Sequence, residues 1–255
     1  MIFDTHCHLN DDALFSSIDE ILEEAKKVGV NKLLVVGWDK NSSISAVHLA
    51  EKYSEIYAAI GFHPSNVFNA TEEEYKEVMS YISHPKVVAV GEIGLDYHWN
   101  KTIEERKIQK EFFIRQIKIA NEHCKPITIH NREAFEDCLE ILKEYKPKMG
   151  GVMHCYSGSL ESLPEVLNLG LLIGLGGTLT FTNAKKIKEI CEEAPLEKIV
   201  VETDAPYLSP HPLRGTTNVP KNIALVVDEI ARIKKISKKH IIDVLYQNSC
   251  KMFHV

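Results

Sequence analysis

The feature that most constrains the fold is a series of eight apolar runs, rich in valine and isoleucine, separated by amphipathic, charge-rich stretches. The runs cover residues 1–9, 32–38, 56–64, 86–97, 125–132, 150–158, 169–181 and 198–206. Nearly continuous apolar runs are typical of strands that are buried on both faces of a parallel sheet. Residues 17–29 and 102–123 are two of the helical stretches between them, and the second repeats apolar residues at steps of three and four. The sequence therefore predicts an α/β protein.

The count of strand–helix units narrows the architecture. Eight units in 255 residues predict a closed (β/α)8 TIM barrel that occupies residues 1–255 as a single domain. An open doubly wound sheet is the alternative, but the glycine-rich dinucleotide motif that would favour it is absent after the first run. Residues 209–220 form the longest irregular stretch, and we expect them to lie over the barrel mouth.

Charge and cysteine usage limit the class of protein. A net charge of -6 argues against a protein that binds duplex nucleic acid through a global basic field. The six cysteines are scattered, without a C-x-x-C motif, which predicts free thiols in a reducing cytosol. The sequence shows no secretory leader and no apolar run of membrane-spanning length. We therefore expect a cytoplasmic protein with no membrane association and no obligate protein partner.

Ionisable side chains gather where the predicted strands end. The first run ends in "FDTHCHLN", and His6 and His8 share one face of a strand because side chains alternate. By the same parity Cys7 and Cys155 should face the helix layer as small core residues. Other ionisable groups at the ends of later runs are His63, Glu92, Asp96, His130, Arg132, His154, Glu202 and Asp204. In a parallel barrel these ends meet at one mouth, where active sites form.

So many ionisable groups at one mouth would be unfavourable without a cation among them. Four imidazoles and two carboxylates suit two divalent metal ions with open positions. The predicted ligands are His6, His8, Glu92, His130, His154 and Asp204. Glu92 has two oxygens and can bridge the pair, which would then polarise a water molecule. The sequence does not choose among Mg, Mn and Zn, although imidazole ligands favour Zn or Mn.

The same stretches carry a family resemblance. The segments "FDTHCHLN", "GFHP", "VAVGEIGLDY", "ITIHNR", "HCYSG", "GLGGTLTF" and "VVETDAPYLSP" resemble those of TatD-family metal-dependent hydrolases, within the amidohydrolase-like barrels. The resemblance covers essentially the whole chain and implies a two-metal deoxyribonuclease. It assigns one ion to His6, His8, Glu92 and Asp204, and the second to Glu92, His130 and His154. The chain departs from the family at Val219, where a glutamate is common.

The resulting hypothesis is hydrolysis of phosphodiester bonds at the 3′ end of single-stranded DNA. Glu92 and Asp204 are the predicted catalytic residues, with Asp204 as general base. His63 and Arg132 would hold phosphate oxygens, and Glu202 would bind substrate, orient a ligand or bind a further cation. An amide or ester hydrolase that uses the same metals, such as a D-aminoacyl-tRNA deacylase or a small cyclic amidase, is the alternative. A non-enzymatic barrel is a third possibility, against which the complete ligand set argues.

Overall fold

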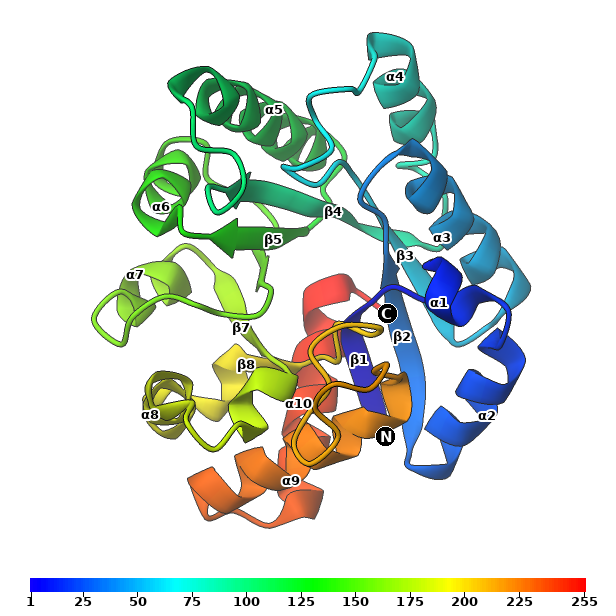
Figure 1. Cartoon of the computed structure of the whole chain (residues 1–255), viewed down its shortest axis with the longest axis vertical. Coiled ribbons are helices and arrows are strands. Elements are labelled where there is room, and N and C mark those ends of the chain that lie inside the picture. The colour runs from blue at the N-terminus through cyan, green and yellow to red at the C-terminus, as the bar shows by residue number, and fades with distance from the viewer.

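The computed structural model describes residues 1–255, and its eight strands follow one another in sequence order around one parallel sheet. The strands are β1 (Ile2–Cys7), β2 (Val30–Val36), β3 (Ile56–Ile60), β4 (Val87–Asp96), β5 (Ile127–Arg132), β6 (Gly151–Met153), β7 (Leu171–Leu175) and β8 (Ile199–Val201). Helices alternate with the strands and surround them (Figure 1). The chain is therefore a TIM barrel, which confirms the predicted fold.

The helices cover the outside of the barrel. They are α1 (Asp12–Phe15), α2 (Ile18–Lys27), α3 (Lys40–Lys52), α4 (Glu72–Ser80), α5 (Ile103–Glu122), α6 (Phe135–Glu144), α7 (Leu163–Asn168), α8 (Lys185–Glu193), α9 (Ile223–Lys234) and α10 (Lys238–Phe253), with short 3-10 helices at Gly177–Thr180, Leu196–Lys198 and Pro220–Asn222. The long helix α5 begins at a capping box, in which Thr102 and Glu105 satisfy each other's backbone N–H groups. None of the helices combines the length and apolar character needed to cross a bilayer.

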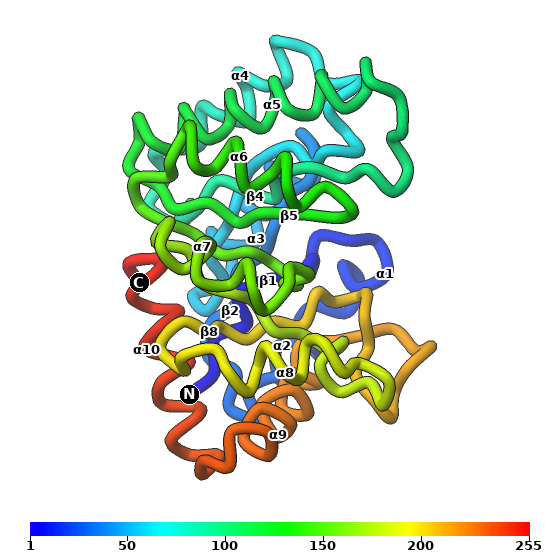
Figure 2. The backbone as a smooth tube through the Cα atoms, turned by 90° about the vertical axis from the view of Figure 1, so that its left-hand side faces the viewer, coloured from blue at the N-terminus to red at the C-terminus, as the bar shows by residue number.

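The barrel has two different ends. Figure 2 shows both chain termini at one end, and α1 and the segment after β8 at the other. Phe253 of α10 packs against Phe3 of β1 with ring centroids 5.8 Å apart, so apolar side chains fill the barrel near the terminal end. The carboxyl ends of the strands point the other way. Two predicted runs, 150–158 and 198–206, are longer than β6 and β8, and their last residues form loops at this second end.

The first strand contains an irregularity that places its histidines. Asp4 pairs with Leu33 of β2 and Cys7 with Val35, so one extra residue separates these pairs in β1. Phe3 consequently lies in the cluster that fills the barrel, whereas Cys7 lies in the core between barrel and helices. The bulge therefore moves the inward face of β1 from odd-numbered to even-numbered residues before the chain reaches His6.

Hydrogen bonds from side chains and from the backbone just after β8 join it to β1, where no strand pairing closes the sheet. The backbone N–H and the hydroxyl of Thr203 donate to the Asp4 carboxylate at 3.0 and 2.6 Å. The Thr5 hydroxyl donates to the carbonyl of Val201 at 3.0 Å. Burial raises the pKa of Asp4 to about 7, despite the hydrogen bonds from Thr203. This buried polar seam holds the strand that carries the two N-terminal histidines against β8.

We expect Thr203→Val to destabilise the protein more than Thr5→Val. At pH 8.5, where Asp4 is ionised, losing a hydrogen bond to a buried carboxylate should cost about 1.5–3 kcal/mol, against about 0.5–1.5 kcal/mol for the neutral bond of Thr5. For a chain of this size the first change should lower the melting temperature by about 3–12 °C. Thermal unfolding followed by circular dichroism measures both, and equal losses in the two variants would contradict a charged seam.

Candidate metal centre

Glu92 of β4 lies at the centre of the mouth. Its Oε2 atom is 3.5 Å from His6 Nε2 and 3.8 Å from His8 Nε2. Its Oε1 atom is 2.8 Å from His130 Nδ1 and 3.9 Å from His154 Nε2. The two carboxylate oxygens therefore face two different pairs of imidazoles, which is the arrangement that a bridging ligand requires.

Asp204 completes the first of these groups. Its Oδ1 atom lies 3.8, 3.5 and 3.6 Å from the Nε2 atoms of His6, His8 and His154. Two ligands that each lie about 2.1 Å from one ion at a tetrahedral angle are about 3.4 Å apart. The spacing of these donor atoms is thus close to that of a metal coordination shell. Asp204 adopts a left-handed φ of 58°, a conformation that aspartate tolerates better than most residues.

The partners of the Nδ1 atoms of His8 and His154, which point away from the cluster, determine the tautomers of these two histidines. His8 Nδ1 lies 3.0 Å from the carbonyl of Val36, and His154 Nδ1 lies 3.0 Å from Glu202 Oε1. A carbonyl oxygen only accepts, so His8 Nδ1 carries hydrogen and, in the neutral ring, its Nε2 offers a lone pair. His154 Nδ1 faces the Glu202 carboxylate without hydrogen-bond geometry, and this contact favours the same tautomer. His6 Nε2 is fully buried and has no hydrogen-bond partner. An orphaned buried nitrogen among carboxylates fits a cation as its missing partner.

Electrostatics support the same conclusion. Burial alone would raise the pKa of Glu92, but the surrounding His6, His130 and His63 hold it well below its usual range. Burial lowers the pKa of His130, yet hydrogen bonds to Asp96 at 3.0 Å and to Glu92 outweigh this effect and raise it to about 9. The carboxylates at the centre therefore require positive charge beside them, either as imidazolium or as a bound cation.

His63 has the opposite tautomer to His8 and His154. Its Nδ1 accepts a hydrogen bond from the backbone N–H of Ser65 at 3.1 Å, so in the neutral ring Nε2 carries the hydrogen. Nε2 lies 3.9 Å from Glu92 Oε1, and the ring meets that of His130 edge-on at 4.2 Å. Burial and His130 lower the pKa of His63 to about 3. His63 thus presents a neutral N–H donor at the edge of the cluster.

Glu202 and Asp204 bracket His154 rather than pointing together into the mouth. Glu202 is completely buried, and its Oε1 atom accepts a hydrogen bond from the backbone N–H of Cys155 at 2.6 Å as well as facing His154. It has no surface that a substrate could contact. The geometry favours its role in orienting His154 over the role in substrate binding that the sequence also suggested.

Cys155 corrects a prediction. Strand parity placed it in the core beneath the helices, but β6 ends at Met153 and Cys155 has a φ of 43°. Its thiol consequently joins His154 and Asp204 in a group whose ligand atoms all lie within 4.8 Å of one another. The prediction is confirmed for Cys7, which is buried in the core with its sulfur 3.5 Å from the carbonyl of Leu34.

Arg132 ends β5 at the rim, pairs in register with Asp96 and is exposed to solvent. Val219 packs partly buried against the core, and the loop around it is anchored by Asn218, whose side chain donates to the carbonyls of Thr203 and Tyr207 at 2.8 Å. The glutamate that this chain lacks at position 219 is therefore not needed to attach the loop.

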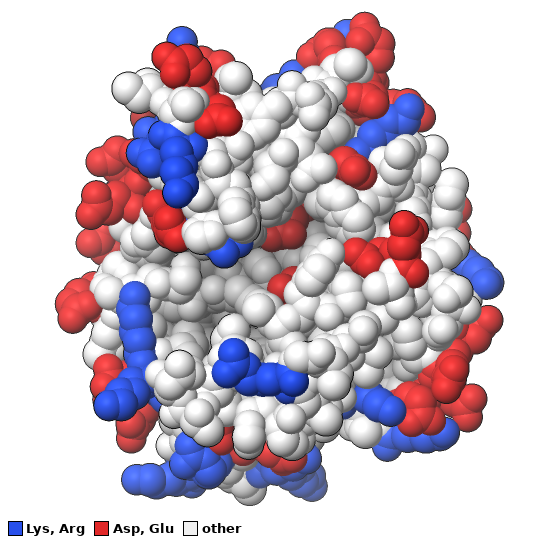
Figure 3. All heavy atoms as spheres, viewed as in Figure 1, with Lys and Arg blue, Asp and Glu red and all other residues white.

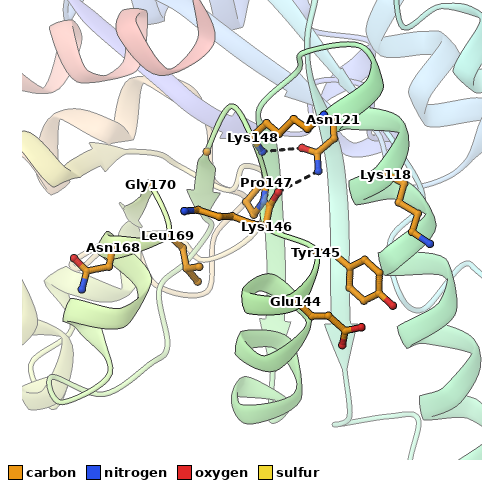
Figure 4. A pocket seen from close by; sticks show the side chains of 11 residues that line it. Lys118, Asn121, Glu144, Tyr145, Lys146, Pro147, Lys148, Asn168, Leu169 and Gly170 are labelled. Carbon is orange, nitrogen blue, oxygen red and sulfur yellow. Dashed lines mark hydrogen bonds between the residues drawn. The ribbon is translucent and has the colours of Figure 1, made fainter.

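The space-filling view shows the mouth as a hollow, with aspartate or glutamate side chains at its floor and lysine or arginine side chains near its rim (Figure 3). A separate cavity of about 650 Å³ lies at the opposite end, between the carboxyl ends of α5, α6 and α7 (Figure 4). There Asn121 accepts a hydrogen bond from the backbone N–H of Lys148 and donates to the carbonyl of Lys146. This second cavity contains no histidine or cysteine, so the metal-binding chemistry is confined to the mouth.

Known proteins resemble this chain in sequence and in fold. The family model described as TatD related DNase matches residues 3–254. The chain is 42% identical to the metal-dependent hydrolase YabD of Bacillus subtilis, over 100% of both sequences. It is 33% identical to the metal-dependent hydrolase YcfH of Escherichia coli, over 100% of this chain and 96% of the relative.

Solved structures of other proteins have the same fold as this chain. YJJV, a TatD homolog from Escherichia coli, superposes with a TM-score of 0.95 at 29% identity, covering 100% of this chain and 98% of that one. Organophosphorus hydrolase from Deinococcus radiodurans has a TM-score of 0.67 at 14% identity, with 99% of this chain and 92% of that chain covered. The second likeness shows a shared barrel fold only.

Proposed function

The chain belongs to the TatD related DNase family and is a metal-dependent hydrolase, and on this premise we propose that it cleaves phosphodiester bonds at the 3′ end of single-stranded DNA. The observation that carries the proposal is the cluster around Glu92, in which imidazole and carboxylate donors from β1, β4, β5, β6 and β8 converge and leave His6 Nε2 without a partner.

The ligand atoms divide into two sets. His6, His8, Glu92 and Asp204 would hold one divalent ion, and Glu92, His130 and His154 would hold the second. Bound ions would supply Lewis acidity toward the phosphate and lower the pKa of water so that hydroxide is available near neutral pH. The four imidazoles favour Mn or Zn over Mg.

The remaining groups act on the proton and on the phosphate. Asp204 has a pKa held below its usual value, against the effect of burial, by His154, His8 and His6, so it is ionised and can accept a proton as general base. His63 offers an N–H donor, and Arg132 a guanidinium without a carboxylate partner, to the phosphate oxygens. Glu202 would keep His154 in the tautomer that leaves Nε2 free.

A substrate panel tests the proposal. Purified protein with Mn²⁺ should shorten 5′-labelled single-stranded DNA stepwise from its 3′ end, and excess EDTA should stop the reaction. The same preparation should act far more slowly on a D-aminoacyl-tRNA and on a cyclic amide, because an N–H donor and an arginine at the rim suit an anionic phosphate. Hydrolysis of an amide or ester without cleavage of DNA would replace this proposal with the alternative chemistry.

A further inference from the structure

The five arginines of this chain fall into two kinds. Arg115 pairs with Glu72 through two hydrogen bonds of 2.7 Å, and Arg232 pairs with Glu229 through two of 2.8 Å. The other three have no carboxylate oxygen within 4.0 Å: Arg106, Arg132 and Arg214. Each of these lies over an aromatic ring, as Arg115 also does, but without a carboxylate partner. Guanidinium groups held by stacking keep their hydrogen-bond donors free for an external anion.

Arg106 and Arg132 share one groove. The groove has a volume of about 690 Å³ and lies beside the mouth, where β4, β5 and β6 lead into their loops. Arg106 stacks on Tyr97 at 4.4 Å, and its Nε atom is buried without a hydrogen-bond partner. Asn131 and Ser157 add polar side chains to the wall.

Three acidic residues also line the groove, and two of them are already paired. Glu133 faces His98 Nδ1 at 2.6 Å. Asp137 accepts a hydrogen bond from the Tyr97 hydroxyl at 2.6 Å and lies 2.7 Å from Lys110 Nζ. Only Glu136 has neither a hydrogen-bond nor an ion-pair partner among the three, whereas both guanidinium groups that line the groove have no carboxylate oxygen within 4.0 Å.

An exposed aromatic ring stands next to the groove. Trp99 is 70% exposed. The guanidinium carbon of Arg132 lies 5.8 Å from the centroid of the indole ring. The His98 ring meets the indole edge-on, with ring centroids 4.5 Å apart. A tryptophan with this much free surface is a platform on which a nucleobase can stack. Arg132 connects the platform to the groove, because its guanidinium lies over the indole and its side chain also lines the cavity.

The platform adjoins the metal centre. Arg132 pairs in register with Asp96, and Asp96 contacts the Nε2 atom of His130. We propose that Trp99, Arg132 and Arg106 form a binding site for the unpaired nucleic-acid strand next to the bond at the metal centre. Trp99 stacks one base, and the two arginines contact backbone phosphates. This site rests on the proposed function, which places the scissile phosphodiester at the cluster.

Binding measured apart from cleavage tests the site. We would titrate the full chain against a fluorescein-labelled oligothymidylate in EDTA, which prevents cleavage, and follow fluorescence anisotropy. Trp99→Ala should weaken binding by about 5- to 150-fold, the loss expected for one stacked base, and Trp99→Phe should restore most of it. Unchanged affinity in Trp99→Ala would overturn the platform. Because Trp99 is exposed, the variant should melt like the wild type.

The contribution of positive charge in the groove to binding is tested with variants of two neighbouring residues. Arg106→Gln and Lys107→Gln each remove one positive charge from the start of α5, but only Arg106 lines the groove. Arg106→Gln should reduce the slope of log affinity against log salt by about 0.7, and Lys107→Gln should leave it unchanged. Equal effects would mean that net charge alone attracts the strand, and would overturn the groove.

Two further arms identify the ligand and separate the hypotheses. A blunt duplex of the same length should bind more weakly than the strand, since its bases are already stacked, and equal binding would overturn the site. An oligouridylate that loses affinity in Trp99→Ala as the DNA does would extend the site to RNA. The proposed function is checked separately, on wild-type hydrolysis of methyl nitrophenyl phosphate, a phosphodiester that has no nucleobase to stack on Trp99.

Discussion

Replacing Asp204 by asparagine should lower the rate of DNA cleavage by at least about three orders of magnitude while leaving the fold intact. The carboxylate Oδ1 atom faces three imidazole nitrogens at once, so the substitution removes a metal ligand and the proposed general base together. An amide has nearly the same volume, and asparagine tolerates the left-handed backbone found at this position. The loss should therefore reflect chemistry rather than unfolding.

Initial rates on labelled single-stranded DNA with Mn²⁺ would measure this effect, and circular dichroism would verify the fold. Asp243→Asn, which removes an exposed carboxylate from α10, is the matched control and should retain wild-type activity. If Asp204→Asn kept more than a tenth of the wild-type rate, Asp204 would be neither the base nor an essential ligand.

The barrel could be predicted because its signal is repeated eight times along the chain. Each strand is buried on both sides and therefore reads as an apolar run, and the number of runs specifies the eight-stranded barrel. The bulge in β1 could not be predicted. It occurs beside Asp4, whose side chain accepts a hydrogen bond from the backbone of Thr203, a residue 199 positions away.

The gathering of ionisable residues at one mouth was also predictable, since parallel strands bring their carboxyl ends together. The direction in which each side chain points was harder to predict. β6 is only three residues long and Cys155 follows it with a left-handed φ, so the strand alternation that the sequence suggests no longer applies at Cys155. The tautomers of the histidines could not be predicted from the sequence, because they depend on partners far along the chain, such as the carbonyl of Val36 for His8.

The Trp99 platform could not be derived from the sequence. Trp99 lies in a loop, and neither periodicity nor spacing shows that Arg132, 33 positions later, stacks against it. An arginine without a carboxylate partner becomes apparent only when the whole set of ion pairs is known. A tryptophan in a polar loop that directly follows a run of site residues is the one hint that the sequence contains.

Divalent ions should stabilise the wild-type protein, and Glu92→Gln should abolish most of that gain. At a metal concentration about a thousandfold above the dissociation constant, binding adds about 4 kcal/mol to the free energy of unfolding. For a chain of this size this corresponds to a rise of about 8–16 °C in melting temperature. Glu92 faces both ligand sets through its two oxygens, so the amide would weaken both sites at once.

Thermal unfolding with Mn²⁺, with Zn²⁺ and with EDTA measures the gain, and elemental analysis counts the ions bound. Glu136→Gln, on the rim but outside the cluster, is the control and should show the full rise. Without metal, Glu92→Gln should melt below the wild type, because the neutral amide no longer balances the buried His130 imidazolium, so the metal-induced rise is compared within each variant. A variant that still bound two ions with the full rise would show that Glu92 does not bridge them, and the two-ion arrangement would have to be built on other ligands.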